Sequence, residues 1–394
     1  MEFGLAQRLQ RIRPSATVSI TARAQRLREQ GRDVIVLSVG EPDFPTPEHI
    51  KAAAVEALAR NDTKYTPVDG SRRLKDAIVA KLARDNGLTY TAEQVLASTG
   101  AKQSCYNACL ALLDRGDEAI VPAPYWVSYP DMVRLADAEP VIVESTARNG
   151  FKISAAQLAA AITPRTRLLM LNSPCNPTGA VYSRADWIAL GEVLRAHPRV
   201  VVLSDEIYEH IYWADGDFTS FAAACPHLYD RTLTVNGMSK GYAMSGWRIG
   251  YAAGPAAVIK AMTSLQGQST TNACTISQAA AAAALVGEQR CVHEMCAEFK
   301  ARHDYFFAGI SRLPGFTCVP ASGTFYLLPN VEAAMRAKRI ANDVELCERL
   351  LEDTGVALVP GAAFGAPGHV RLSFAASMTT LSAAIERLEQ FVAR

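Results

Sequence analysis

The chain has 394 residues, of which 49% are hydrophobic and 20% are charged, and its formal net charge at pH 7 is +1. A chain of this length predicts two or three domains, and its composition is typical of a soluble globular protein. The near balance of charges argues against nucleic acid as a partner, and no run approaches the ~18 consecutive apolar residues that a membrane span needs. We therefore expect neither nucleic acid nor a membrane among its partners.

The nine cysteines and the arginine-rich N-terminus bear on the location of the protein. The cysteines form no C-x-x-C pair and no Cys/His spacing typical of a metal site, which favours reduced thiols in a cytoplasmic protein without a metal. Within the first 30 residues, six arginines accompany Leu5, Leu9 and Ile12 at helical spacing. This pattern is superficially similar to an organelle transit peptide, but no apolar signal core or cleavage motif follows it, so we expect a plain amphipathic helix.

The middle of the chain alternates short apolar runs, rich in β-branched residues, with helical patterns. Two of the helical patterns, residues 102–114 and 183–196, are apolar on one face. Apolar strands that alternate with helices predict a mostly parallel, doubly wound α/β sheet with helices on both faces. The predicted strands are residues 94–99, 118–123, 140–145, 167–174, 200–206, 232–237 and 248–254.

The sequence changes character near residue 290, where a long charged helical pattern begins. Further strand-like runs and a final helix follow, which predicts a smaller α+β domain. An isolated strand-like run ends the N-terminal segment, and we expect that segment to join the smaller domain. The strand-like runs are residues 34–40, 316–329, 356–361 and 369–375. The predicted units are an N-terminal segment, 1–45, a large domain, 46–290, and a small C-terminal domain, 291–394.

Polar, glycine-bearing clusters follow five of the predicted strands. Ligands of open α/β sheets bind outside the carboxyl ends of the strands, so these clusters predict a single cleft. The clusters are STGAK (98–102), PAPYW (122–126), NSPCNPTG (172–179), SDEIY (204–208) and NGMSK (236–240).

Lys240, in the last cluster, is the candidate catalytic residue. A lysine whose pKa is lowered in a cleft can form a Schiff base with a carbonyl group. A lysine that binds pyridoxal 5'-phosphate in this way needs three supports: an anion site for the phosphate, a carboxylate at the ring nitrogen, and donors to the phenolic oxygen.

The candidate phosphate site lies where a helix begins directly after a strand. Gly100, Ala101 and Lys102 open this helix, so its backbone N–H groups and dipole favour an anion. Ser239 and Arg248 would complete the site, because arginine matches phosphate with a fixed, charged fork.

The other two supports come from the neighbouring strand ends. Asp205 ends an apolar strand, where it could hold the ring nitrogen protonated or, alternatively, cap the segment that follows. Tyr208 and Asn176 could both donate to the phenolic oxygen. Trp126 or Tyr125 could stack on the ring, although an aromatic residue after a strand is often part of the core.

Together these motifs resemble the class I aminotransferases of the aspartate aminotransferase family, which have pyridoxal-phosphate fold type I. The match is close to the bacterial branch that includes aspartate and prephenate aminotransferases, and it extends from about residue 5 to the C-terminus. The motifs that carry the resemblance are PSAT (14–17), GEPDFPTP (40–47), TKYTPVDG (63–70), PAPYWVSYPDM (122–132), NSPCNPTGAVYS (172–183), SDEIYEH (204–210) and SKGYAMSGWRIGYAAGP (239–255).

The resemblance implies a role for each matching position. It makes Lys240 the Schiff-base lysine and proton shuttle, and Asp205 the partner of the ring nitrogen. It implies that Tyr65 reaches the phosphate of the neighbouring subunit, and hence a homodimer with shared active sites. Arg371 would bind the substrate α-carboxylate with Gly40 and Asn176, although a lone strand arginine could lie at the surface. The remaining implied cofactor contacts are Asn176 and Tyr208 at the phenolic oxygen, Ala101, Lys102, Ser239 and Arg248 at the phosphate, and Trp126 against the ring.

The resemblance leaves substrate choice less defined. In this branch a basic residue before PSAT closes over the site, so Arg13 could contact a distal carboxylate or be solvated, and Lys102 could serve that carboxylate as well as the phosphate. Gly267 and Ala273 stand where relatives usually carry serine and proline, and Cys175 lies in the NSPCNPTG loop. These departures leave a shifted substrate range open.

The implied activity is transfer of an amino group from aspartate to 2-oxoglutarate by a ping-pong mechanism, with prephenate as a further acceptor. Its alternatives are an aminotransferase for aromatic or other amino acids, and a pyridoxal-phosphate lyase on the same fold. A non-catalytic regulator that senses the cofactor is a third alternative, but such proteins carry a helix-turn-helix ahead of this domain, and we expect none here.

Overall fold

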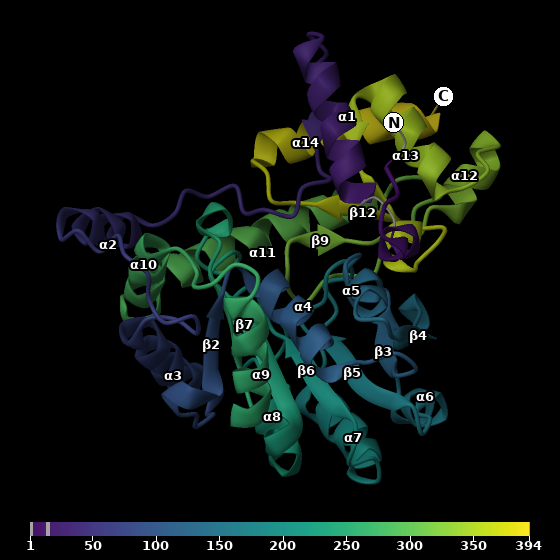
Figure 1. Ribbon diagram of the computed structural model, residues 1–394. Coiled ribbons are helices and arrows are strands. Elements are labelled where there is room, and N and C mark those ends of the chain that lie inside the picture. Colours follow the sequence, from purple (N-terminus) through teal and green to yellow (C-terminus); the bar gives the residue numbers. More distant parts are fainter. Residues whose placement is uncertain (1–2, 13–15, 394) are drawn as a thin grey trace.

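A seven-stranded sheet forms the centre of the large domain in the computed structural model, which describes residues 3–12 and 16–393 (Figure 1). The strand order is β2-β8-β7-β6-β5-β3-β4. All neighbouring strands run parallel except β8, which is antiparallel to both β2 and β7. The strands are β2 Val95–Ser98, β3 Glu118–Ala123, β4 Glu139–Glu144, β5 Thr166–Asn172, β6 Val201–Asp205, β7 Thr232–Gly237 and β8 Gly250–Ala253. The predicted mostly parallel α/β sheet is confirmed.

The inner strands are mostly apolar and buried because helices cover both faces of the sheet. In β5, Leu168 and Met170 pack with α4, α5 and α9, whereas Leu169 and Leu171 pack with α7 on the opposite face. Only the edge strand β4 alternates buried and exposed residues. The helices of this domain are α2 Glu48–Ala59, α3 Arg72–Asn86, α4 Ala101–Leu112, α5 Tyr129–Leu135, α6 Ala155–Ala161, α7 Arg184–Arg195, α8 Phe221–Ala224, α9 Ala256–Gly267 and α10 Thr275–Val286.

Short strands and longer helices make up the smaller α+β unit. Strand β1 pairs in parallel with β10, and the order β11-β12-β9 forms an antiparallel sheet. Figure 1 shows α1 beside the C-terminal helices above the large sheet. The strands are β1 Ile35–Val36, β9 Tyr326–Leu327, β10 Val356–Ala357, β11 Val359–Pro360 and β12 Val370–Ser373. The helices are α1 Ala16–Glu29, α11 Arg290–Ile310, α12 Glu332–Lys338, α13 Asp343–Thr354 and α14 Met378–Ala393.

The N-terminal segment contacts both units. Helix α1 packs against β10 and β11, whereas the 3-10 helix η1, Gln7–Arg11, packs against α5 of the large domain. Arg11 Nη1 lies 2.6 Å from a carboxylate oxygen of Asp137. The expected amphipathic helix over Leu5 and Leu9 is wrong: both side chains are exposed, and they precede or lie within a short 3-10 turn. The domain boundaries at residues 45 and 290 stay a prediction.

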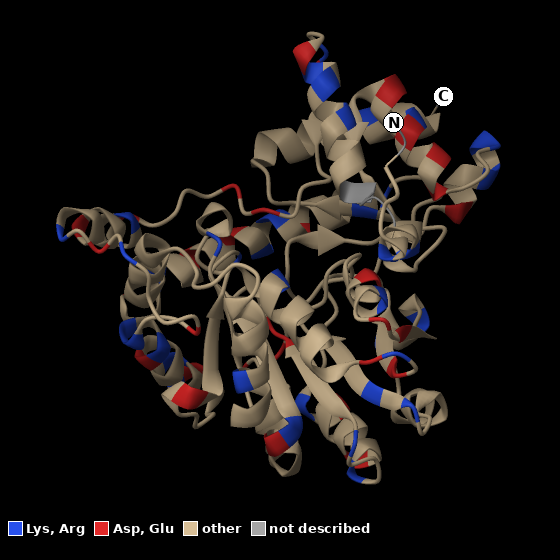
Figure 2. Cartoon of the chain, viewed as in Figure 1, with Lys and Arg blue, Asp and Glu red and all other residues tan. Residues whose placement is uncertain are grey.

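Charged side chains lie mainly on the outer helices. Figure 2 shows Lys and Arg interspersed with Asp and Glu along these helices, while the strands of the large sheet carry few of them. Within residues 3–12 and 16–393, no helix is long and apolar enough to cross a membrane, and no cluster of three or more His, Cys, Asp or Glu could hold a metal.

Candidate active site

Lys240 follows β7 and points across the cleft to the N-terminal segment. Its Nζ donates a hydrogen bond to the carbonyl oxygen of Gly40 and lies 5.8 Å from the ring centroids of Tyr208 and Phe325. Burial lowers the pKa of Lys240 to about 8, against a smaller opposing effect of the Glu41 carboxylate, which raises this pKa. A large share of this amine is therefore neutral near pH 8, which is the form a nucleophile or base requires.

Asp205 ends β6 and is 4% exposed. Its Oδ2 accepts a hydrogen bond of 2.6 Å from the Tyr129 hydroxyl, and the Cys105 thiol approaches the same oxygen at 3.9 Å. Its Oδ1 accepts a hydrogen bond from the backbone N–H of Ile207 at 3.2 Å. Burial raises the pKa of Asp205 to about 6, although the hydrogen bond from Tyr129 opposes the rise. No helix follows Asp205 directly, so its bond to Ile207 is a local turn and not a helix cap.

Tyr129 is a site residue that the sequence analysis missed. It begins α5 three positions after Trp126, and the two rings pack edge to face with centroids 5.4 Å apart. Its spacing from Trp126 was the available signal, because one turn of chain after a strand end brings both side chains to the same edge of the sheet.

The N-terminus of α4 and Arg248 form the candidate phosphate site. Gly100 has a φ of +80°, and a Cβ atom there would collide with the Arg248 guanidinium, so glycine satisfies both the backbone and the close approach. Arg248 itself is left-handed, with φ +56°, and donates to the Ser245 carbonyl oxygen at 2.8 Å. Arg248 has no carboxylate partner among the residues that the structure describes. Ser239 is buried, one residue before Lys240.

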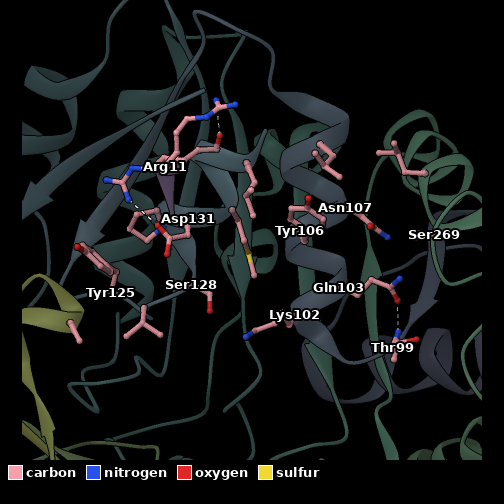
Figure 3. A pocket seen from close by; sticks show the side chains of 18 of the residues that line it. Arg11, Thr99, Lys102, Gln103, Tyr106, Asn107, Tyr125, Ser128, Asp131 and Ser269 are labelled. Atoms are coloured by element: carbon pink, nitrogen blue, oxygen red, sulfur yellow. Dashed lines mark hydrogen bonds and ion pairs between the residues drawn. The ribbon is translucent and has the colours of Figure 1, made fainter. Parts of the chain in front are cut away.

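Lys102 lies at the mouth of the same site. Its Nζ is 4.8 Å from the centroid of the Trp126 ring, a cation–π distance. Burial and the neighbouring Arg248 charge both lower the pKa of Lys102. Lys102, Arg248 and Tyr125 line a groove of about 1150 Å³ that continues between α4 and α5 as far as Arg11. Figure 3 shows Lys102 extending from α4 toward the side of this groove that carries Ser128.

Arg371 on β12 forms the other end of the cleft and is 2% exposed. Its guanidinium donates to Asn176 Oδ1 at 3.1 Å and to the Ser38 carbonyl oxygen at 2.6 Å. The guanidinium also lies over the rings of Tyr326 and Phe364, at 4.4 and 4.9 Å from their centroids. Its Nε is buried without a hydrogen-bond partner, and no described residue supplies it with a carboxylate. Burial lowers the pKa of Arg371.

Tyr208 lies between these two ends. It is buried, and its hydroxyl is 3.0 Å from the Tyr326 hydroxyl, in a contact between the large domain and β9. Burial raises the pKa of Tyr208, so the hydroxyl stays protonated and can donate. Tyr326 is a second residue that the sequence analysis missed, because the contact joins positions 118 residues apart.

Two predicted site residues, Tyr65 and Arg13, and the three departures from the family pattern remain to be placed. The Tyr65 side chain is 90% exposed and does not enter the cleft of its own chain. Arg13 lies outside the described residues. Cys175 is buried and donates to the Pro124 carbonyl oxygen at 3.6 Å. Ala273 is buried, and a Cβ atom at Gly267 would make only an ordinary contact with Val68.

The residues present fit pyridoxal phosphate. Asp205 is a buried acid at the position expected for a cationic ring nitrogen, and Arg248 with the start of α4 is a cationic site that a side chain at Gly100 would fill. The Arg371 guanidinium, buried with an unpaired N–H, fits a carboxylate ligand. Lys240 stands between these groups with its pKa lowered.

The fold and this site define a pyridoxal-phosphate-dependent aminotransferase of fold type I. The chain belongs to the class I and II aminotransferase family, whose model matches residues 32–388.

Individual relatives match over nearly their full lengths. The chain is 49% identical over 394 residues to an aspartate/prephenate aminotransferase of Cereibacter sphaeroides, covering 99% of this chain and 98% of that protein. It is 46% identical over 390 residues to one of Nitrosomonas europaea, covering 98% of each. Among solved structures, the aspartate aminotransferase of Rhizobium meliloti superposes with a TM-score of 0.96 at 46% identity, covering 100% of both chains. The Thermus thermophilus aspartate aminotransferase with maleate gives a TM-score of 0.92 at 46% identity, covering 99% of this chain and 100% of that one.

Proposed function

We propose that this aminotransferase transfers the amino group of aspartate to 2-oxoglutarate by a ping-pong mechanism. The observation that carries the proposal is the buried Arg371 guanidinium, whose Nε lacks a partner. A buried, unpaired cation is costly, and a substrate α-carboxylate would satisfy it with a bidentate, charge-assisted contact. Asn176 accepts a hydrogen bond from Arg371 and Gly40 accepts one from Lys240, and both would help to orient the carboxylate.

Pyridoxal phosphate, when bound, supplies a ring that takes up the electron pair released at the substrate Cα. Lys240 provides the base. Its neutral amine removes the Cα proton, holds it at Nζ and would return it to the carbon of the cofactor. Asp205, fixed by Tyr129, keeps a proton at the ring nitrogen. Tyr208 and Asn176 would donate to the phenolic oxygen, and Trp126 would cover the ring.

The phosphate would be held by Ala101, Lys102, Ser239 and Arg248, with the dipole of α4 behind it. We further propose a homodimer in which Tyr65 reaches the phosphate of the other subunit. The support is the position of Tyr65, which is exposed, and the absence of a carboxylate partner for Arg248 among the described residues.

The second carboxylate of a dicarboxylic substrate needs a second cation. Lys102 at the mouth of the cleft is one candidate, and Arg13 on the segment that follows η1 is the other. Relatives named for aspartate support this choice, as does the relative solved with maleate, a four-carbon dicarboxylate. Two relatives named for prephenate as well support it as a further acceptor, and the groove beyond Lys102 offers room for a larger dicarboxylate.

A cytoplasmic location is also proposed. All nine cysteines are free, and several of them are buried, which is typical of a protein that functions in a reducing compartment.

Half-transamination of the purified holoenzyme tests the proposed activity. Each amino acid of a panel is added alone, and the change in cofactor absorbance is followed. Aspartate and glutamate are expected to react fastest. Fast reaction with aromatic amino acids but not with dicarboxylic ones would replace the proposed substrate. Release of pyruvate with ammonia or thiol, without any keto-acid acceptor, would identify a lyase.

A further inference from the structure

Residues 63–71, which carry Tyr65, form neither a helix nor a strand, yet side chains from other elements hold them closely. Thr275 Oγ1 donates to the Lys64 carbonyl oxygen at 2.7 Å, directly before Tyr65. Gln278 Nε2 donates to Thr66 Oγ1 at 3.0 Å, directly after it. The tyrosine is therefore bracketed by contacts with the first turn of α10.

Gln278 commits its whole amide to this arrangement. It is 1% exposed, and its Oε1 accepts a hydrogen bond of 2.7 Å from the backbone N–H of Ser71. Its Nε2 donates to the Ala273 carbonyl oxygen at 2.8 Å as well as to Thr66. One buried amide thus links the residue directly after Tyr65, and the last residue of the segment, to the start of α10.

A second buried amide, on α9, also holds the same segment. Gln266 of α9 is buried, and its Nε2 donates to the carbonyl oxygens of Val68 and Ala97, each at 2.9 Å. Ala97 lies on β2, three residues before Gly100. The Tyr65 segment is therefore fixed to the strand that leads into the phosphate site of its own chain.

This order is unexpected for a segment whose Tyr65 side chain is 90% exposed. Fixing backbone costs about 1–2 kcal/mol per residue in conformational entropy, and an exposed tyrosine returns little of that cost within one chain. Order of this kind is useful when it prepares a side chain for binding, because the entropy is lost before the partner arrives.

We infer that Gln278 is a positioning residue for cofactor binding in the other subunit: it holds Tyr65 where the hydroxyl meets the phosphate at the partner's site. The inference rests on the proposed homodimer and deepens it. The hydrogen bonds of the Gln278 side chain join Thr66, Ser71 and Ala273, so it acts through Thr66 and Ser71 on Tyr65.

Titration of the cofactor-free protein with pyridoxal phosphate provides the first test. Gln278→Met keeps the length of the side chain and removes its hydrogen bonds, so it is expected to weaken cofactor binding about tenfold, the effect of losing one hydrogen bond to a charged group. Tyr65→Phe should have the same effect. Because both act on one contact, the double variant should bind no more weakly than either single variant.

Gln289→Met is the matched control. Gln289 follows the other end of α10, and its amide also donates to two backbone carbonyl oxygens, those of Ala284 and Gly287, but it does not contact residues 63–71. It should leave the dissociation constant of the cofactor unchanged. Thr275→Val removes the Lys64 contact at a more exposed position and should weaken binding in the same direction, which keeps the test valid if Gln278→Met fails to fold. Additive losses in the double variant would overturn the inference.

A hybrid dimer decides whether Gln278 acts in the other subunit. Differently tagged Gln278→Met and Lys240→Ala chains are combined, so the one site with a lysine receives its Tyr65 segment from the chain with an intact Gln278. Turnover measured against cofactor concentration should reach half-maximum at the wild-type concentration. If the half-maximum lies at a cofactor concentration about tenfold higher, Gln278 acts within its own subunit. That result overturns the inference about Gln278 but not the proposed homodimer. A monomer in sedimentation that binds cofactor normally overturns the homodimer and this inference together.

Discussion

Two ends of the same cleft are both buried, but they differ in how far the chain satisfies them. At the large-domain end, both oxygens of Asp205 accept hydrogen bonds, from Tyr129 and from the backbone of Ile207. At the small-domain end, Arg371 keeps an unpaired Nε and has no carboxylate partner among the described residues. A satisfied acid is preorganised for a cofactor that stays, whereas an unsatisfied cation is completed by a ligand that comes and goes.

Of the substitutions at the two ends of the cleft, removal of the Asp205 charge should have the largest effect. Asp205→Asn keeps the shape of the side chain but removes the charge that would hold a proton at the ring nitrogen. We expect kcat for aspartate to fall about 10³-fold, as when a preorganised electrostatic contact is lost. Steady-state kinetics at saturating cofactor measures the fall. A loss of less than threefold would remove Asp205 from the mechanism and leave it as a turn residue.

Substitution of Arg371, at the other end of the cleft, should mainly weaken substrate binding. Arg371→Lys retains a positive charge but loses the two-pronged geometry, and we expect kcat/KM for aspartate to fall about 10²-fold, with most of the change in KM. Cofactor affinity, measured by titration, serves as the control and should stay near the wild-type value. Equal weakening of cofactor and substrate would show that the two ends are not separate.

Tyr129→Phe tests whether the hydrogen bond from Tyr129 keeps Asp205 ionised. The hydrogen bond from Tyr129 lowers the pKa of Asp205 against the rise caused by burial, so its removal should raise that pKa above about 6. Because Asp205 must be ionised, the acid limb of the pH–rate profile should move to higher pH, and kcat at neutral pH should fall about tenfold. Tyr129→His keeps a hydrogen-bond donor at this position and should retain more activity than Tyr129→Phe. An unmoved acid limb would mean that Tyr129 only fills space.

Arg13→Ala should have the smallest effect. If Arg13 contacts the distal carboxylate, the ratio of activity with aspartate to activity with an uncharged amino acid should fall several-fold while activity as such remains, in keeping with the ~1 kcal/mol of a solvent-exposed ion pair. Lys102→Ala provides the comparison at the other candidate cation. An unchanged ratio for Arg13→Ala would assign the distal carboxylate to Lys102.

The sequence predicted the mostly parallel α/β sheet well, because this sheet depends on local pattern. Apolar strands followed by polar clusters indicate one edge of a parallel sheet, and this placed Lys240, Asp205 and Gly100 together. The direction of β8 agrees with its connection: the 12 residues between β7 and β8 contain the 3-10 turn η5, Ser245–Trp247, and no crossover helix of the kind that joins parallel strands.

The contacts between the two domains could not be predicted in the same way. Lys240 bonds to Gly40 across 200 positions, Tyr208 meets Tyr326 across 118, and Arg371 reaches Ser38 across 333. These pairs depend on how the small domain packs on the large one, which no local period encodes. The segment over Leu5 and Leu9 was mispredicted for a related reason: η1 contacts α5 and Arg11 pairs with Asp137, more than 100 positions away, and the spacing of the leucines encodes neither contact.

Multiple turnover by Lys240→Ala, with aspartate as donor and 2-oxoglutarate as acceptor, tests the central claim most directly. Product formation by the loaded wild-type enzyme and by the variant is followed over many equivalents of enzyme. We predict that the wild type turns over continuously and that the variant is slower by about 10⁴-fold or more, because it lacks the amine that moves the Cα proton. A variant that turns over at a rate near that of the wild type would contradict the account.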